Sequence, residues 1–448
     1  MLDSRPSSDR VRSPSPAEYL ARADSILKRI FAAYGRPDFA VRLWDGSYPI
    51  VPPDGRPRFT LAINHPGALR RMFLPPSELN LGEAFIFGDY DIEGDIIAAA
   101  GLMDYFPRLR LSVGEIAWLA TQLLSLPRDF AADTTRPGLR PRGERHSRQR
   151  DRETVQYHYE VPSEFYALWL DRGMNYSCAY FQLGEEDLDV AQRQKLEHLC
   201  RKLQLQPGER LLDIGCGWGG LLIYAAQNYG VDATGITLSQ RQMEWAQQRI
   251  AEAGLSQHCR VVLQDYRDVL TDRPFDKLVS VGMVEHVGAA RLPDYFAQAW
   301  RLLKPGGLFL NHGIASLKSH QPPRTLGQRL FQRDSFMQRY VFPDGELVDI
   351  HEMLRAAEGV GFEVRDVESL REHYALTLRH WVRRLEARHT EALKYVDEPT
   401  YRVWRLYMAG CSHSFARSRI GIYQALLSKN AAGGVSGLPW TRAHLYRS

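Results

Sequence analysis

The stretch LLDIGCGWGG (211–220) decides the fold, because it joins a short apolar run to a turn rich in glycine. Strand-like runs follow it at regular intervals and alternate with helical segments. The strand-like runs are RLLDIG (210–215), VDATGI (231–236), CRVVLQD (259–265), FDKLVSVG (275–282) and GLFLNHGI (307–314), and the helical segments include 190–205, 220–229 and 239–254. Such alternation predicts a parallel sheet with helices on both faces, a doubly wound α/β fold.

The glycine turn fits two kinds of nucleotide site. Residues 215–220 satisfy G-x-G-x-x-G, which in nicotinamide enzymes is accompanied by an acid at the end of the second strand. Here Thr237 stands in the place of that acid. Asp213 extends the turn to D-x-G-x-G-x-G, in which the glycines allow the backbone to approach an amino acid and a ribose closely. Together with WRLLKPGG (300–307), a helix that turns into the next strand, the pattern favours S-adenosylmethionine over a dinucleotide and over a turn without a ligand.

Further segments make the chain resemble the cyclopropane-fatty-acyl-phospholipid synthase family. They span about 151–430 in the order of that family, so the resemblance is more specific than any single motif. The segments are HYEVPSEFYALWLDRGMNYSCAYF (158–181), LLDIGCGWGG (211–220), GITLSQRQ (235–242), LQDYRD (263–268), VSVGMVEHVG (279–288), HGI (312–314), HYALTLRHW (373–381) and CSHSFARSRIGIYQ (411–424). The resemblance implies a Rossmann-like class I methyltransferase domain, preceded by a smaller α+β domain that matches the family more loosely.

The resemblance also implies two groups of site residues. S-adenosylmethionine is expected to contact Tyr176, Ser177, Asp213, Gly215, Cys216, Gly217, Gly219, Thr237, Leu238, Gln242, Asp265 and Tyr266. A bicarbonate ion is expected at Cys178, Glu285, His312, Ile314 and Tyr374, with Cys178 and Ile314 contributing mainly backbone groups. No metal site is expected.

The implied reaction is methyl transfer to a cis double bond of a phospholipid acyl chain, which forms a cyclopropane ring. An alkene attacks the sulfonium methyl without a base, and the cation that forms needs negative or π-rich neighbours. A base near neutral pH then removes a proton so that the ring closes, and bicarbonate oriented by Glu285, His312 and Tyr374 suits this step. Cys178 and Cys411 are expected among the catalytic residues by family analogy, although no step needs a thiol nucleophile, and Cys200 is expected to be structural.

Composition places the chain among ordinary globular proteins of two or three domains. The expected organisation is a disordered tail (1–20), a small domain (21–130), an Arg-rich linker (131–152), the methyltransferase domain (153–430) and a C-terminal tail (431–448). Within the small domain, GEAFIFGDYDIEGD (82–95) is expected to be turn-rich β structure, followed by helices near 96–126.

The charge and the length of the apolar runs limit which partners and which location are expected. No run approaches the roughly 20 apolar residues needed to cross a bilayer, so membrane contact is expected to be peripheral. RPGLRPRGERHSRQRDR (136–152) carries seven arginines against two acids and is either a solvated linker or a surface for anionic headgroups. The net charge of +4 is too small to indicate nucleic acid, and five unpatterned cysteines favour the cytoplasm. A homodimer is left open.

Three alternatives share parts of this pattern. Loss of the proton elsewhere would give a methylene or methyl-branched chain, and a small-amine N-methyltransferase would share the VEHVG region (284–288) without needing Tyr374. A lipid-binding protein with an inactive cofactor fold is the third, and the presence of Glu285 and His312 argues against it.

Overall fold

The computed structural model describes residues 14–35, 37–128, 147–159, 161–317, 325–332 and 335–446. These residues fall into two compact units, one from the chain up to residue 136 with 325–334, the other from 137–324 with 335–448. None of the helices within these ranges is both long and apolar enough to span a membrane.

The second unit is built on a seven-stranded sheet with the order β6-β5-β4-β7-β8-β10-β9. The strands are β4 (Arg210–Ile214), β5 (Asp232–Thr237), β6 (Cys259–Leu263), β7 (Phe275–Val281), β8 (Leu303–Ser316), β9 (Glu363–Ser369) and β10 (Ile420–Lys429). β10 runs antiparallel to both of its neighbours, whereas β4 to β8 pair in parallel. The predicted doubly wound α/β fold is confirmed.

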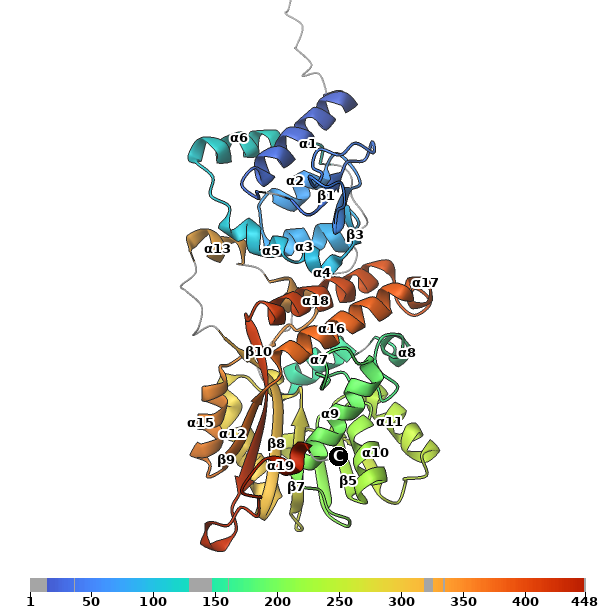
Figure 1. Cartoon of the computed structure of the whole chain (residues 1–448), viewed down its shortest axis with the longest axis vertical. Coiled ribbons are helices and arrows are strands. Elements are labelled where there is room, and N and C mark those ends of the chain that lie inside the picture. Colours follow the sequence, from blue (N-terminus) through green and yellow to red (C-terminus); the bar gives the residue numbers. More distant parts are fainter. Residues whose placement is uncertain are drawn as a thin grey trace, which may run out of the picture. The chain divides into compact units, whose positions relative to one another are not determined.

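Helices cover both faces of this sheet, because successive strand side chains point to opposite sides. Leu211 packs in an apolar cluster with α9, α10 and α11, whereas Leu212 packs in a second cluster with α12 and α15. Figure 1 shows the two groups of helices on opposite sides of the sheet. The predicted helices correspond to α9 (Leu188–Leu203), α10 (Gly220–Tyr229) and α11 (Gln240–Glu252), and the second group is α12 (Leu292–Leu302) and α15 (Ile350–Gly359).

The second unit contains further helices besides those that cover the two faces of the sheet. α16 follows directly on β9 and packs against α18 (Figure 1). These helices are α7 (Arg148–Tyr159), α8 (Ser163–Ala167), α14 (Phe336–Tyr340), α16 (Arg371–Ala387), α17 (His389–Ala392), α18 (Glu398–Ala416) and α19 (Ala443–Tyr446).

Two predicted boundaries of this unit need correction. Most of the Arg-rich linker (131–152) lies outside the described residues, but its last residues are helical because α7 begins at Arg148. The C-terminal tail (431–448) is not an extended appendage: α19 packs against α9, Leu445 is buried, and Arg442 pairs with Asp366 at 2.5 Å.

The first unit is a small α+β fold around a three-stranded sheet with the order β1-β2-β3. β1 and β2 are parallel, and β3 is antiparallel to β2. Its elements are α1 (Pro16–Phe31), β1 (Ala40–Arg42), β2 (Phe59–Ile63), α2 (Ala68–Phe73), α3 (Glu78–Ile86), β3 (Tyr90–Gly94), α4 (Ile96–Ala99), α5 (Leu102–Tyr105), α6 (Val113–Leu124) and α13 (Leu326–Phe331). The helices expected near 96–126 are present as the short α4 and α5, a 3-10 turn at Phe106–Arg108, and the twelve-residue α6.

Three expectations for the first unit were wrong. Residues 16–20 are helical rather than a disordered tail, because Ser15 and Glu18 form a capping box at the start of α1. The first part of 82–95 is helical rather than β, since α3 is capped by Ser77 and buries Leu81, Ala84 and Phe85 on one face. Residues 325–334 belong to this unit and not to the methyltransferase domain.

Candidate active site

A cavity of about 460 Å³ lies at the carboxyl ends of β4, β5, β6 and β7. This is where open α/β sheets bind ligands, and the volume is in the range of small-molecule sites. All the predicted cofactor residues except Gly219 line it, and the structure adds residues of α7, the loop 264–267 and the segment 281–287. The sequence motifs thus converge on one cavity.

The glycine loop shows why its glycines are needed. Gly215 and Gly217 have φ of +84° and +53°, and a Cβ on Gly215 would lie 3.2 Å from the Met283 side chain. Gly219 does not line the cavity. It has φ of +79°, and a Cβ there would meet Ala246 of α11 at 3.1 Å, so it permits close packing of α10 on α11.

Asp213 is the last but one residue of β4, lines the cavity and is only 3% exposed. Among the residues that the structure describes, its Oδ1 has no hydrogen-bonding partner. Burial raises the pKa of Asp213 to about 7, although the nearby charge of Lys195 opposes the shift. A buried carboxylate with an open acceptor suits the ammonium of an amino-acid ligand.

No carboxylate follows β5. The Thr237 hydroxyl donates to Oε1 of Gln242 at 2.8 Å and accepts from the backbone N–H of Ser239 at 3.2 Å. Ser239 in turn caps α11. This end of the second strand therefore presents neutral polar groups to the cavity.

Arg267 forms a clamp of ion pairs that keeps Asp265 ionised, and the sequence did not indicate this clamp. Arg267 donates to both of its oxygens, at 2.9 and 2.6 Å, and also lies 3.1 Å from Asp151 of α7. Burial alone would raise the pKa of Asp265, but the hydrogen bonds and charge of Arg267 lower it below its usual value. The clamp holds Tyr266 at the cavity, with the guanidinium 5.5 Å from its ring centroid.

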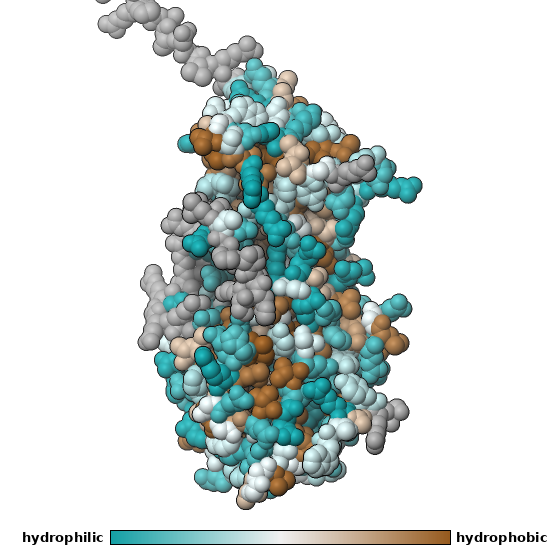
Figure 2. All heavy atoms as spheres, turned by 60° about the vertical axis from the view of Figure 1, so that its left-hand side comes forward, coloured by the Kyte–Doolittle hydropathy of each residue, from teal (hydrophilic) through white to brown (hydrophobic). Residues whose placement is uncertain are grey.

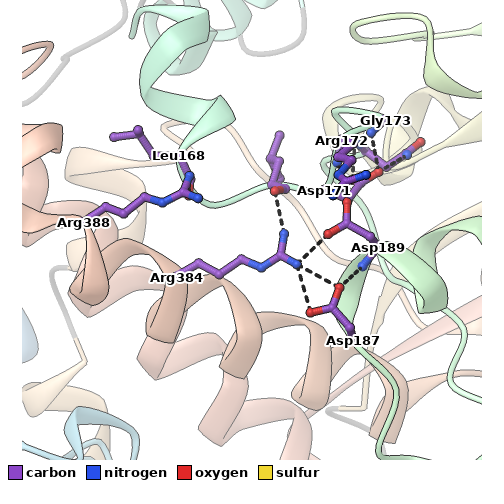
Figure 3. Close-up of polar contacts among 10 residues, drawn as sticks. Leu168, Asp171, Arg172, Gly173, Asp187, Asp189, Arg384 and Arg388 are labelled. Carbon is purple, nitrogen blue, oxygen red and sulfur yellow. Dashed lines mark hydrogen bonds and ion pairs between the residues drawn. The ribbon is translucent and has the colours of Figure 1, made fainter.

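Tyr176 and Ser177 follow a loop whose polar groups are paired, as Figure 3 shows. Asp171 accepts from the backbone N–H groups of Gly173 and Asn175, each at 2.8 Å, and from the Asn175 side chain at 2.7 Å. From α16, Arg384 donates to the Leu170 carbonyl, at 2.9 Å, and to Asp187 and Asp189.

A second arginine and a lysine complete the support of this loop. Arg388 donates to the Leu168 carbonyl at 2.8 Å, and Lys195 of α9 donates to Oγ of Ser177 at 2.9 Å. The wall of the cavity is thus fixed by residues from two distant helices.

Glu285 and Ile314 meet beside the cavity. Glu285 lies in the short 3-10 helix Val284–His286, and its Oε1 accepts from the Ile314 backbone N–H at 2.7 Å. The contact depends on Gly313, where a Cβ would be 2.2 Å from Val284. Oε2 of Glu285 is buried and, within the described residues, has no partner, and burial raises the pKa of this carboxyl to about 7.

His312 lies one strand further, opposite Val281, which lines the cavity. The side chain is 1% exposed, and neither ring nitrogen has a hydrogen-bonding partner in the described part of the chain. Burial, with the charges of Lys195 and Lys202, lowers the pKa of His312 well below its usual value. The ring is therefore neutral at physiological pH.

Tyr374 reaches the same region from α16 through an aromatic wall. The Tyr176 and Trp381 ring centroids are 5.3 Å apart, those of Tyr374 and Trp381 5.9 Å, and those of Tyr374 and Phe415 4.7 Å. Burial raises the pKa of Tyr374 well above its usual value, and Tyr407, Cys178 and Glu285 add to the shift. The segment HYALTLRHW contains Trp381, but only the fold showed that its ring links the cavity to Tyr374.

The two cysteines proposed as catalytic are protonated thiols. Cys178 is fully buried, and its Sγ contacts the carbonyls of Ala179 and Leu370 at 3.3 and 3.7 Å. Burial raises the pKa of Cys178 and brings that of Cys411 to about 12. Neither has the lowered pKa of a nucleophilic cysteine, and Cys200 is buried in the apolar cluster with α9, as expected.

Comparisons with known proteins show the family of the chain. The family described as mycolic acid cyclopropane synthetase matches residues 146–425. A probable fatty acid methyltransferase of Pseudomonas putida is 40% identical over 407 residues, which cover 91% of this chain and 96% of that protein. The cyclopropane-fatty-acyl-phospholipid synthase of Escherichia coli K12 is 37% identical over 278 residues, covering 62% of this chain and 68% of that protein.

A solved structure bears on the cofactor. The mycolic acid cyclopropane synthase CmaA1, complexed with SAH and CTAB, has 35% sequence identity and a TM-score of 0.58, covering 62% of this chain and 97% of that one. The chain therefore belongs to the mycolic acid cyclopropane synthetase family and is an S-adenosylmethionine-dependent C-methyltransferase.

Proposed function

We propose that the protein methylates a cis double bond of a phospholipid acyl chain and closes a cyclopropane ring. The observation that carries the proposal is the group of Glu285, His312 and Tyr374 beside the cofactor cavity, in which His312, Tyr374 and the Oε2 atom of Glu285 are buried. A methyltransferase acting on a nucleophilic heteroatom needs no such base after methyl transfer, whereas ring closure requires removal of a proton. Relatives named as a fatty acid methyltransferase and a cyclopropane-fatty-acyl-phospholipid synthase support a lipid substrate.

S-adenosylmethionine supplies an electrophilic methyl group on a sulfonium. Asp213, with its open Oδ1, is suited to bind the amino-acid end of the cofactor, and the glycine loop leaves room for the backbone to approach it. The rings of Tyr176, Trp381 and Tyr374 offer π faces to a developing cation. The burial of Trp381 and Tyr374 keeps water away from that cation.

The proton acceptor is proposed to be a small oxyanion such as bicarbonate, held by this chain. Tyr374 offers an O–H donor, and the neutral ring of His312 offers a lone pair that can accept from the hydroxyl of bicarbonate. Glu285 offers an unpartnered Oε2, and its pKa, raised to about 7, leaves it partly protonated near neutral pH. An anion beside Glu285 is favoured by the protonated form of that carboxyl. The donor set thus fits bicarbonate, and its supply would restore activity lost in carbonate-free buffer.

Peripheral contact with the bilayer is proposed for the first unit. α6 exposes Val113 by 84% and Ile116 by 54%, and the exposed Arg110 and Arg128 lie at either end of the helix. Apolar side chains flanked by arginines suit the surface of an anionic membrane. Figure 2 shows separate hydrophobic patches among hydrophilic side chains on one face of the molecule.

The decisive experiment incubates the full chain with S-adenosylmethionine and vesicles of an unsaturated phospholipid. A gain of one CH₂ on the acyl chain is expected, and NMR of the product separates a ring from a methylene or methyl branch. Cofactor binding without any gain on the lipid would overturn the lipid substrate.

A vesicle-binding assay tests α6. Val113→Asp with Ile116→Asp should weaken sedimentation with anionic vesicles at low salt, while the monomer–dimer state stays constant. Unchanged vesicle binding would remove α6 from the membrane contact. A change of oligomeric state instead would favour α6 as a homodimer surface.

A further inference from the structure

A row of polar residues crosses the sheet beside the proposed base. In the antiparallel register, His312 of β8 lies opposite Gln424 of β10, and Gln424 lies opposite Glu368 of β9. Residues directly opposite each other point to the same face, with Cβ atoms about 5 Å apart. The three side chains therefore form a line on the face covered by α9.

The middle of this row is buried without partners. His312 is 1% exposed and Gln424 is 0% exposed. Within the described residues, both ring nitrogens of His312 and both amide atoms of Gln424 lack a hydrogen bond. Buried polar atoms rarely lack a hydrogen bond. Four such atoms on adjacent side chains therefore indicate that a water or small polar molecule bridges them.

The far end of the row is held in place by α9. Oε2 of Glu368 accepts from Nε2 of His198 at 2.7 Å and from Nζ of Lys202 at 2.5 Å. Although burial alone would raise it, these contacts lower the pKa of Glu368 to about 2. Glu368 is therefore a fixed negative acceptor next to Gln424.

This charge determines which end of the Gln424 amide faces which neighbour. The NH₂ group, a donor, is favoured on the side of the Glu368 carboxylate, and the carbonyl oxygen then faces His312. The carbonyl oxygen of Gln424 can accept a hydrogen bond from the His312 ring nitrogen on its side, provided that this nitrogen carries the proton. The tautomer of a neutral histidine is set by the hydrogen bond that its protonated nitrogen makes.

We propose that Gln424 is a positioning residue that selects the tautomer of His312 through a bridging water. One ring nitrogen keeps its proton toward Gln424, and the other presents its lone pair to the proposed base site. Burial disfavours a charged His312 ring, and the charges of Lys195, Lys202 and His198 of α9 add to this, whereas the nearby Glu368 carboxylate opposes it. The inference rests on the proposed function only for the use of His312 in catalysis, because the arrangement of the row is independent of the substrate.

The test uses the full chain labelled with ¹⁵N-histidine. Two-bond ¹H–¹⁵N correlations report the tautomer, and the His312 signal among the 14 histidines is identified by its loss in His312→Asn. The wild type should show one neutral tautomer. Gln424→Met, which fills similar space without an amide, should give a mixture or the other tautomer.

Kinetics provide the second readout. Gln424→Met should lower kcat about 10- to 100-fold, as losses of supporting groups commonly do, with KM for S-adenosylmethionine unchanged. Gln424→Glu keeps a carbonyl acceptor and should retain the wild-type tautomer with most of kcat. Ser428→Ala, another buried polar residue of β10, is the matched control and should behave as the wild type.

Each outcome decides the inference. A wild-type tautomer and kcat in Gln424→Met would overturn it, as would a mixed tautomer in Gln424→Glu. If the wild type does not methylate lipid at all, the proposed function fails while the tautomer comparison still judges the role of Gln424.

Discussion

The loop 168–177 and the row of His312 and Gln424 both contain buried polar groups, but they differ in whether these groups have hydrogen-bonding partners. In the loop, Asp171 accepts three hydrogen bonds, and Arg384 and Arg388 reach backbone carbonyls (Figure 3). In the row, and in Glu285 next to it, buried atoms of the described chain remain without partners.

The contrast distinguishes residues that support the wall of the cavity from residues that take part in the reaction. A paired network holds a wall rigid, as the loop does for Tyr176 and Ser177. An unpaired buried group costs about 1–3 kcal/mol and persists where a ligand or a reaction uses it. Substitutions in the loop should therefore change cofactor binding and stability, whereas substitutions near the row should change turnover.

The largest effect is expected for Glu285→Gln. It preserves size and the contact with Ile314 but cannot take up or release a proton, so kcat should fall by about 10³-fold or more. Transfer of labelled methyl from S-adenosylmethionine to vesicles measures kcat, and calorimetry should show nearly unchanged cofactor affinity.

The exposed Glu244→Gln on α11 controls for loss of one carboxylate and should leave kcat at the wild-type level. Wild-type turnover in Glu285→Gln would remove Glu285 from the mechanism and weaken the contrast.

A tenfold effect is expected from pH on cofactor binding. Asp213 has a pKa raised to about 7, and only its ionised form attracts an ammonium group. Because ionisation increases as the pH rises toward 7, the affinity for S-adenosylmethionine should increase about tenfold between pH 5.5 and 7. Asp213→Asn should abolish this dependence, and a pH slope that survives the substitution would assign it to another group.

A smaller effect is expected for Arg384→Leu in the paired loop. Losing its bonds to Leu170, Asp187 and Asp189 should cost about 1–3 kcal/mol of unfolding free energy and weaken cofactor binding a few-fold. Urea denaturation and calorimetry measure the two quantities. Arg172→Leu, whose exposed side chain lies in the same loop, is the control. A loss of kcat at saturating cofactor would show that the loop does more than support the wall.

The features that the sequence predicted are those that depend on residues close together in the chain. The strands and helices of 190–316 were predictable because apolar periodicity is local. That most of the expected cofactor residues would line one cavity was predictable because they lie at the ends of successive strands. Gln424 was not assigned a role, since its place beside His312 depends on β10 inserting between β8 and β9. A glutamine inside the apolar run IGIYQALL (420–427) was the available signal.

The supporting arginines show the same limit. Arg384 reaches the loop from a helix more than 200 residues away, and nothing in its own segment indicates that contact. The error at 82–95 had a local cause, because glycine and aromatic residues occur in both turns and short helices. Only the cap at Ser77 distinguishes them.

The smallest effect is expected at Cys411, which the family resemblance included among the catalytic residues. Burial raises the pKa of its thiol to about 12, so almost no thiolate is present at neutral pH. Proton removal and cation stabilisation need a base and π faces, which Glu285, His312 and the aromatic wall supply. Cys411→Ala should therefore keep kcat within about twofold of the wild type, the range expected for removing one partly buried thiol. A large loss of kcat without a loss of stability would mean that Cys411, although it belongs to neither the paired loop nor the polar row, positions Tyr374 nearby.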